Sequence, residues 1–320
     1  MKMVVLDGYC KNPGDISWEP LTSLCETTIY DRTEPEQLLE RIAGADIVLS
    51  NKVVITAEDM DKCPDLKCIC IPATGYDHID CAAASERGIT VCNVPEYGAF
   101  SVAQHVFAML LDITNRVSLH DASVRAGDWC NCPDFCYWKA PLHELCGKTM
   151  SIFGYSCKGD NMAAMAKAFG MKVMVDGEPS VDSELMFVDR LTAIRNADVI
   201  VLNCDLNEDT RGMICADTIA EMKAGVIIIN VSRGALIVDE DLIAGLKSGK
   251  IGYAALDAVA REPMQPDDIL LQAPNCIINP HIAGCTVECR QKLMDITTEN
   301  IRRFLAGNPQ NLVITPTPIK

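Results

Sequence analysis

The 320-residue sequence predicts an α/β fold built on parallel sheets. Three observations lead to this fold class. Short apolar runs of strand length alternate with stretches of helical spacing along most of the chain. One strand–turn–helix–strand unit carries glycines at its turn. Charged residues follow several successive apolar runs, where the carboxyl ends of parallel strands would lie. The length is sufficient for two domains.

Composition limits the function classes. The formal net charge is −16 and no stretch is strongly basic, so we expect no nucleic-acid binding. Apolar residues make up 49% of the chain, which is enough for sizeable cores. No apolar run approaches the roughly 20 residues of a membrane-spanning helix. The first residues lack a signal-peptide pattern. We therefore expect a cytoplasmic protein without membrane contact.

The 17 cysteines are scattered through predicted strands and helices, which favours reduced thiols over a disulfide framework. The densest group is Cys130, Cys132 and Cys136. Its spacing differs from a paired C-x-x-C site, and no histidine lies within a few residues. Zinc or an iron–sulfur cluster is the alternative, but we favour inert thiols and predict no metal.

Residues 1–98 alternate apolar runs (2–6, 47–49, 68–71) with helical stretches such as 35–42. Polar residues follow two of the runs. Asn51 and Lys52 end one, and Thr74 and Gly75 end another. Ligands bind at such strand ends, and Gly75 would let backbone N–H groups approach a small anion. From this segment alone, a plain turn is the preferred interpretation.

Residues 99–127 predict one long helix, apolar on more than one face, as expected of a linker helix or a subunit interface. His105 and His120 on it are expected to be packing or surface residues and not ligands. The following loop is rich in aromatic residues and cysteines. This loop could reach a partner subunit.

Residues 147–178 form the unit around which the chain is organised. An apolar run at 150–153 leads into a turn with Gly154 and Gly159, and a second run at 171–175 ends at Asp176. Between them a helix, ended by Gly170, presents one apolar face: Met162, Met165, Ala166 and Phe169. This is the βαβ unit of dinucleotide sites, in which helix N-terminal N–H groups face a pyrophosphate and the terminal acid accepts hydrogen bonds from a ribose.

The glycine signature of this unit is incomplete. Ser156 stands where the second glycine of G-x-G-x-x-G is expected, and Lys158 replaces an apolar residue. An ordinary βα turn is therefore equally compatible with the motif taken alone.

The last third continues the alternation, with strands expected at 198–203, 226–231, 252–256 and 276–278. Asp239 is expected to cap a helix to about 249, and another helix should span about 286–306. Arg233, Asp257, Glu262 and His281 all follow apolar runs. Singly they suit a surface arginine, a capping aspartate or a solvated glutamate. If the strands are parallel neighbours, however, all four residues would lie at one edge of the sheet. The arginine guanidinium could bind a carboxylate, the histidine could carry a proton, and an acid beside the histidine could orient its ring.

Seven stretches spread over nearly the whole chain match one family pattern: ATGYDHID (73–80), NVPEYGAFSVAQHVFAMLL (93–111), ELCGKTMSIFGY (144–155), AKAFGMKV (166–173), NVSRGALIVDEDL (230–242), ALDAVAREP (255–263) and NPHIAGCT (279–286). With them the chain resembles the D-isomer-specific 2-hydroxyacid dehydrogenases. SNKVVIT (50–56) and FCYW (135–138) suggest the glycerate dehydrogenase and hydroxypyruvate reductase branch.

The resemblance implies two doubly wound parallel-sheet domains. A Rossmann-type dinucleotide-binding domain, residues 99–287, would be inserted into a flavodoxin-like substrate domain made of residues 1–98 and 288–320. Family members are usually homodimers, joined through the long helix and the loop after it.

The resemblance also implies roles. Arg233 matches the clamp on the substrate carboxylate and carbonyl, His281 the general acid, Glu262 its paired carboxylate, and Asp257 the residue that fixes the nicotinamide carboxamide. The implied substrate-binding positions are Asn51, Lys52, Thr74, Gly75 and Arg233. The implied cofactor-binding positions are Val102, Gly154, Ser156, Cys157, Lys158, Asp176, Cys204, Asp205, Val231, Ser232, Asp257, His281 and Gly284.

Departures from the family pattern cluster on the cofactor side. Ser151 and Ser156 replace glycines, and Asn203-Cys204-Asp205 replaces His-x-Pro. Gly177 occupies the usual position of the ribose acid, so Asp176 or Glu178 would substitute. No arginine or lysine stands at 176–178 for a 2′-phosphate, which favours NAD over NADP.

We therefore expect an NAD-dependent dehydrogenase that reduces a small 2-oxo acid, with hydroxypyruvate or glyoxylate giving D-glycerate or glycolate. One alternative is a catalytically weak or inactive relative that senses nucleotides or binds a partner. Another is an enzyme that uses NADP.

Overall fold

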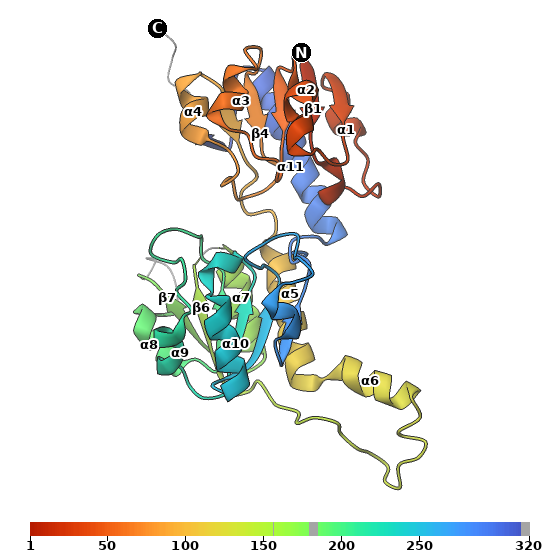
Figure 1. Ribbon diagram of the computed structural model, residues 1–320, viewed down its shortest axis with the longest axis vertical. Coiled ribbons are helices and arrows are strands. Elements are labelled where there is room, and N and C mark those ends of the chain that lie inside the picture. The colour runs from red at the N-terminus through yellow and green to blue at the C-terminus, as the bar shows by residue number, and fades with distance from the viewer. Residues whose placement is uncertain (156, 179–184, 315–320) are drawn as a thin grey trace. The chain divides into compact units, whose positions relative to one another are not determined.

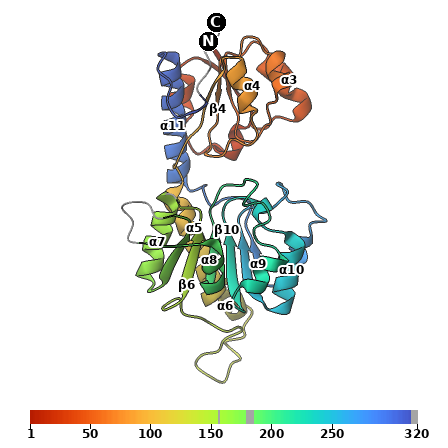
Figure 2. The same ribbon diagram turned by 90° about the vertical axis from the view of Figure 1, so that its left-hand side faces the viewer.

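The computed structural model describes residues 1–155, 157–178 and 185–314, and the chain divides into two compact units. The first unit contains Met1–Tyr97 and the C-terminal part from Cys285, and the second contains Gly98–Gly284. These divisions lie close to the expected positions 99 and 288. Figures 1 and 2 show the elements of each unit.

The first unit holds a six-stranded sheet in the order β13-β5-β4-β3-β1-β2. The five strands β1 to β5 are parallel, and their order is that of flavodoxin-like sheets. The C-terminal strand β13 pairs antiparallel with β5 at one edge of the sheet, and this strand was not predicted from the sequence. The strands are β1 (Lys2–Val5), β2 (Glu26–Ile29), β3 (Ile47–Leu49), β4 (Cys68–Cys70), β5 (Thr90–Cys92) and β13 (Leu312–Ile314).

Helices cover both faces of this sheet, with a separate apolar core under each face. Side chains of α2, α3 and α4 pack with one set of strand residues, and those of α1 and α11 pack with the other. The helices are α1 (Glu19–Thr22), α2 (Leu38–Ile42), α3 (Ala57–Asp61), α4 (Cys81–Glu86) and α11 (Val287–Leu305), with 3-10 turns η1 (Gly8–Cys10) and η2 (Pro35–Gln37).

The second unit holds a seven-stranded parallel sheet in the order β12-β11-β10-β9-β6-β7-β8. Counted from β6, this is the Rossmann order 3-2-1-4-5-6 with one more strand at the edge. The predicted fold class is confirmed. The strands are β6 (Thr149–Phe153), β7 (Lys172–Asp176), β8 (Met186–Val188), β9 (Val199–Leu202), β10 (Val226–Asn230), β11 (Ile251–Leu256) and β12 (Cys276–Ile278).

The central strands β6 and β9 are buried along their whole length because helices lie on both faces. Helices α5 and α7 pack on one face, and α8, α9 and α10 on the other, as Figure 2 shows. The elements are α5 (Ala99–Asn115), α6 (Val117–Arg125), α7 (Cys157–Ala168), α8 (Arg190–Asn196), α9 (Ala216–Glu221) and α10 (Asp239–Ser248), with 3-10 turns η3 (Gly234–Leu236) and η4 (Ile269–Gln272).

Two local predictions were wrong. The single helix expected at 99–127 is two helices, because Arg116 is left-handed with φ 51° and ends α5. The Arg116 guanidinium lies 4.3 Å from the ring centre of Tyr253, a cation–π contact. Asp239 is the first residue of α10 and not its cap, since the N-cap position is Val238.

Helix α6 and residues 126–142 project from the body of the second unit (Figure 1), and we call them the arm. Several of its large apolar side chains face solvent, with Phe135 89% and Trp138 70% exposed. Such a patch is unusual on an isolated subunit. Among the described helices, none combines the length and apolar content that crossing a bilayer requires.

Candidate active site

Three neighbouring strands of the second unit carry the predicted catalytic residues. Strand β11 pairs with β10 on one side and with β12 on the other, all parallel. Their carboxyl ends therefore lie at one edge of the sheet. Arg233 follows β10, Glu262 follows β11, and His281 follows β12. The topology brings the three to a common edge, as expected.

The loop after β10 fixes the backbone of Arg233. Asn230 Nδ2 donates to the Arg233 carbonyl over 2.9 Å, and Asn230 Oδ1 accepts from Ser232 N over 3.1 Å. The next residue must be glycine, because a Cβ on Gly234 would lie 1.9 Å from the carbonyl carbon of Val259. The Arg233 loop is thus packed directly on the backbone that leads to Glu262.

His281 and Glu262 form a close pair. His281 Nδ1 lies 2.9 Å and 2.8 Å from the two carboxylate oxygens of Glu262. An ionised carboxylate only accepts, so Nδ1–H is the donor. His281 adopts φ 56°, which is uncommon for a residue other than glycine, and the side chains of the pair are 35% and 31% exposed. The ring is held in one orientation and remains accessible to solvent.

Asp257 anchors the loop that carries His281. Its carboxylate accepts from the backbone N–H groups of Ile282 and Ala283, both over 2.8 Å. His105 Nε2 lies 3.4 Å from the same carboxylate. Burial alone would raise the pKa of Asp257, but the contacts from His105 and from the two N–H groups outweigh it and lower that pKa. The carboxylate therefore stays charged and fixes the backbone next to His281.

The glycine turn after β6 is closely packed against the loop after β9. Gly154 has φ +91°, and a Cβ there would lie 2.4 Å from the Cys204 Cα. Asn203 Nδ2 donates to the Gly154 carbonyl over 3.0 Å, and Ser232 Oγ donates to the Cys204 carbonyl over 2.5 Å. The strand-end loops of β6, β9 and β10 are therefore linked. Only glycine fits at position 154, and helix α7 begins three residues later, an arrangement compatible with an anion at the helix N-terminus.

The other predicted cofactor residues all belong to the second unit, some of them near the Gly154 turn. Ser156 lies outside the described residues, as does the side chain of Cys157. Burial raises the pKa of the Cys204 thiol to about 11, so it stays protonated. Lys158 is in the first turn of α7, Asp205 is exposed, Val102 is buried on α5, Val231 directly follows β10, and Gly284 ends the unit.

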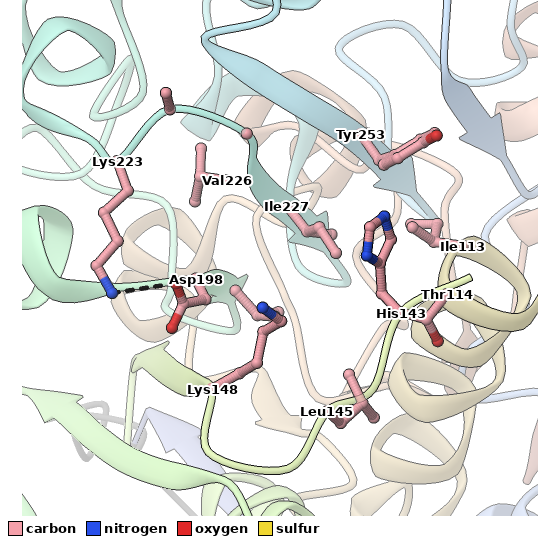
Figure 3. Close-up of a pocket in the computed structure, with 13 residues that line it drawn as sticks. Ile113, Thr114, His143, Leu145, Lys148, Asp198, Lys223, Val226, Ile227 and Tyr253 are labelled. Atoms are coloured by element: carbon pink, nitrogen blue, oxygen red, sulfur yellow. Dashed lines mark hydrogen bonds and ion pairs between the residues drawn. The ribbon is translucent and has the colours of Figure 1, made fainter. Parts of the chain in front are cut away.

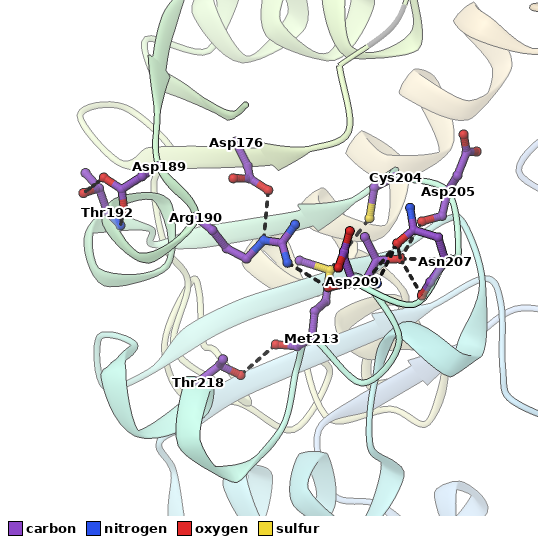
Figure 4. Close-up of polar contacts among 11 residues, drawn as sticks. Asp176, Asp189, Arg190, Thr192, Cys204, Asp205, Asn207, Asp209, Met213 and Thr218 are labelled. Carbon is purple, nitrogen blue, oxygen red and sulfur yellow. Dashed lines mark hydrogen bonds and ion pairs between the residues drawn. The ribbon is translucent and has the colours of Figure 1, made fainter. Parts of the chain in front are cut away.

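The predicted ribose acid, Asp176, ends β7 in register with Phe153, the residue before Gly154. It is paired with Arg190, whose Nε lies 3.3 Å from Asp176 Oδ2. Figure 4 shows this pair and the hydrogen-bonded loop at Asn207. Residues 176–178 include no arginine or lysine, but the fold brings the cation of Arg190 to Asp176 from α8.

In the first unit, Thr74 and Gly75 follow β4. The Thr74 side chain donates to the Val94 carbonyl over 3.0 Å, and the Thr74 carbonyl accepts from Asn93 over 2.8 Å. The backbone N–H groups of Thr74 and Gly75 make no hydrogen bond to any residue that the structure describes. Two adjacent unbonded N–H groups at a strand end suit a carboxylate.

Asn51 and Lys52 follow β3. Their backbone N–H groups donate to the carboxylate of Asp7 over 2.7–3.1 Å, so these N–H groups are already satisfied. Asn51 is 3% exposed, and its Oδ1 has no hydrogen-bond partner among the described residues. An unsatisfied buried acceptor is costly. The predicted contribution of Asn51 therefore rests on its side chain and not on its backbone.

The comparisons with known proteins decide the family. A family model described as D-isomer specific 2-hydroxyacid dehydrogenase, NAD binding domain, matches residues 107–283. A hydroxypyruvate reductase of Blautia hydrogenotrophica is 45% identical over 320 residues, covering 98% of this chain and 99% of the relative. The chain belongs to the D-isomer-specific 2-hydroxyacid dehydrogenases.

Further relatives of this dehydrogenase agree. A glycerate dehydrogenase of Methylorubrum extorquens is 40% identical over 287 residues, covering 89% of this chain and 90% of the relative. An acyclic imino acid reductase, solved in complex with NADPH and D-Arg, superposes with a TM-score of 0.87 at 27% identity, covering 98% of this chain and 100% of that one. The family assignment and the glycerate dehydrogenase and hydroxypyruvate reductase branch are confirmed.

The protein is therefore an oxidoreductase that transfers a hydride between a nicotinamide cofactor and a small 2-oxo or 2-hydroxy acid. No comparison supports the alternative of a nucleotide-sensing or partner-binding relative. Across the described residues, no three His, Cys, Asp or Glu side chains are grouped so that they could hold a metal ion.

The dehydrogenase also has a pocket of about 170 Å³ at the opposite edge of the same sheet (Figure 3). Val199 and Val226, which begin β9 and β10, line it together with His143, Lys148 and Tyr253. None of the predicted site residues lines it. Because ligands of such sheets bind at the carboxyl ends of strands, we do not assign the pocket to the active site.

Sequence reasoning missed several supporting residues: His105, Arg190, Asn203 and Asn230. Asn230 carried a usable signal, since it is a polar residue that ends a run of apolar ones. Asn203 departs from the family pattern, yet its side chain donates a hydrogen bond to the Gly154 carbonyl. Local spacing gives no signal for His105 or Arg190, whose partners are brought near by the tertiary fold.

Proposed function

We propose that this dehydrogenase reduces hydroxypyruvate or glyoxylate, with NADH as the preferred cofactor, to D-glycerate or glycolate. The observation that carries the proposal is the His281–Glu262 pair, with Nδ1 2.8 Å from Oε2, at the sheet edge that also holds Arg233. The names of the relatives, hydroxypyruvate reductase, glycerate dehydrogenase and glyoxylate reductase, support the choice of substrates.

The carbonyl carbon would accept a hydride that a bound nicotinamide would supply. His281 supplies the proton for the carbonyl oxygen. Because Nδ1–H is donated to Glu262, the proton is transferred from Nε2. Glu262 stabilises the protonated ring and fixes its orientation. Arg233 binds the carboxylate and carbonyl through its planar fork, which orients the carbonyl for attack.

For the substrate carboxylate we propose the backbone N–H groups of Thr74 and Gly75, supported by their lack of partners among the described residues. Asn51 would accept a hydrogen bond through Oδ1, and Lys52 would add positive charge. In the reverse reaction the same groups would hold a 2-hydroxy acid.

For the cofactor we propose that backbone at the Gly154 turn, including Ser156, Cys157 and Lys158, holds the pyrophosphate. Asp176 would accept hydrogen bonds from the adenosine ribose, which favours NAD over NADP. The predicted roles of Val102, Cys204, Asp205, Val231, Ser232, His281 and Gly284 around the dinucleotide, and of Asp257 at the nicotinamide carboxamide, belong to this proposal. Asp257 would act there mainly through the loop that it anchors.

We further propose a cytoplasmic homodimer joined through α5 and the arm. The exposed apolar side chains of the arm support this, because association would bury them. Sedimentation of the wild type and of a Phe135→Ser, Trp138→Ser variant tests the proposal. A dimer that the double substitution weakens is expected. A wild type that stays monomeric at all concentrations would refute it.

The test of the activity is NADH oxidation, followed at 340 nm, across a panel of small 2-oxo acids with glyoxylate and hydroxypyruvate included. Turnover with one of these two is expected, with lower kcat/KM for NADPH. Absence of turnover across the whole panel with either nucleotide would overturn the proposal.

A further inference from the structure

The Asp176–Arg190 pair lies where the cofactors NAD and NADP differ. Asp176 is the register partner of Phe153, so its carboxylate ends the strand next to the glycine turn. An acid at this place in a βαβ unit receives the ribose hydroxyls of a dinucleotide. Asp176 Oδ1 makes no hydrogen bond to a described residue, whereas Oδ2 faces Arg190 Nε at 3.3 Å. Figure 4 shows the guanidinium pointing toward Asp176.

Arg190 is held in place by more than this one contact. It is the first residue of α8, whose N-cap is Asp189, and Asp189 accepts from Thr192 N over 3.0 Å. Arg190 Nη1 donates to the carbonyl of Asp209 over 2.9 Å. Its Nη2 makes no hydrogen bond within the described part of the chain, and the side chain is 41% exposed. The Arg190 guanidinium would therefore stay near this position if Asp176 lost its charge.

We propose that Arg190 is a 2′-phosphate receptor that Asp176 keeps neutralised, so that the pair determines the preference for NAD. The inference rests on the proposed binding of the dinucleotide at the Gly154 turn. A 2′-phosphate would have to displace a carboxylate from the guanidinium and then lie beside that carboxylate, which like charges oppose. Without the carboxylate, the same fork suits a phosphate through two parallel hydrogen bonds.

This changes the reason for cofactor selectivity. The absence of a cation at 176–178 does not explain it, because the fold supplies one from α8. What excludes NADP in this proposal is the charge on Asp176, and a single neutral replacement should be enough to admit it.

The experiment measures Kd for NADH and NADPH by fluorescence titration, and for 5′-AMP and 2′,5′-ADP by calorimetry, so that no activity is required. The proteins are the wild type, Asp176→Asn, Arg190→Gln and the double variant. A second double variant, Asp176→Asn with Arg195→Gln, is the matched control. Arg195 is on the same helix and also pairs with a carboxylate, Glu221, at 2.7 Å.

Asp176→Asn is expected to tighten NADPH and 2′,5′-ADP by about 10- to 100-fold, the scale of one charge-assisted contact. The same substitution should raise the Kd for NADH several-fold. Adding Arg190→Gln should abolish the gain, whereas adding Arg195→Gln should leave it. The gain should also shrink as salt is added.

Two results would overturn the inference while leaving the proposed function intact. In the first, Asp176→Asn binds NADH but shows no higher affinity for NADPH than the wild type. In the second, the higher affinity for NADPH persists when Arg190→Gln is added. A wild type that already binds NADPH more tightly than NADH would also overturn it. A wild type that binds neither nucleotide would overturn the proposed function, and this inference with it.

Discussion

The two halves of the sheet in the second unit differ in how closely the residues at their strand ends follow the family sequence pattern. At the ends of β10, β11 and β12, Arg233, Glu262 and His281 are the residue types that the family pattern calls for, and the structure brings His281 and Glu262 into contact. At the ends of β6 and β9, Ser156 and Asn203 depart from the pattern. Yet Gly154 keeps its left-handed turn, and Asn203 binds it.

The difference fits the roles that we propose for the two halves. Proton transfer and carboxylate binding need particular functional groups, so few side chains can replace one another there. A pyrophosphate is held mainly by backbone N–H groups, so the side chains around the turn can vary provided that the backbone keeps its path. Predictions that alter a functional group should therefore have larger effects than those that alter the turn.

The largest effect is expected for His281→Asn. Asparagine cannot carry the proton, so kcat should fall by about 10²- to 10⁴-fold, the scale of a lost general acid. Nucleotide Kd should change little, because the turn at Gly154 is untouched. Stopped-flow and steady-state kinetics with glyoxylate test this, and near-normal kcat would contradict the assigned role.

Arg233→Ala is expected to lower kcat/KM by about 10²- to 10³-fold, as for removal of one oriented donor to the reacting group. Arg233→Lys should not restore activity, because an ammonium cannot make the two-pronged contact that a guanidinium makes. Thermal denaturation of both variants controls for folding. Full activity in Arg233→Lys would show that charge alone is needed there.

Gly154→Ala tests the cofactor half through its backbone. The new Cβ would lie 2.4 Å from Cys204 Cα, so the turn must move and nucleotide binding should weaken by at least about tenfold. The matched control is Gly147→Ala, which also has positive φ (+78°) but nothing within 4 Å of the new Cβ. Each alanine should cost about 1–2 kcal/mol of stability for the left-handed backbone, and only Gly154→Ala should change Kd. Equal Kd values would show that the close packing at Cys204 is irrelevant to binding.

The sequence predicted most of the fold, because strand and helix periods are local properties. It predicted that Arg233, Glu262 and His281 share one sheet edge, because each follows an apolar run that ends there. It failed where one residue's conformation depends on a distant partner. Arg116 breaks the long helix while its guanidinium stacks on Tyr253, and Arg190 pairs with Asp176 from the far side of a connecting segment. Neither pairing leaves a periodic signal in the chain.

The smallest expected effects concern Ser156 and Lys158, and these predictions are based on the sequence because Ser156 lies outside the described residues. A serine side chain adds bulk where a glycine lets the backbone approach the pyrophosphate, so Ser156→Gly should tighten NADH. A lysine in the first turn of α7 can attract a phosphate, so Lys158→Ile should loosen NADH in the wild-type background. We expect about 1 kcal/mol for each change, or several-fold in Kd, measured by NADH fluorescence. Salt should diminish the lysine effect and leave the serine effect unchanged, because only the former is electrostatic. Unchanged affinity in Ser156→Gly would mean that the turn accommodates serine, and tighter binding in Lys158→Ile would mean that the lysine opposes the nucleotide.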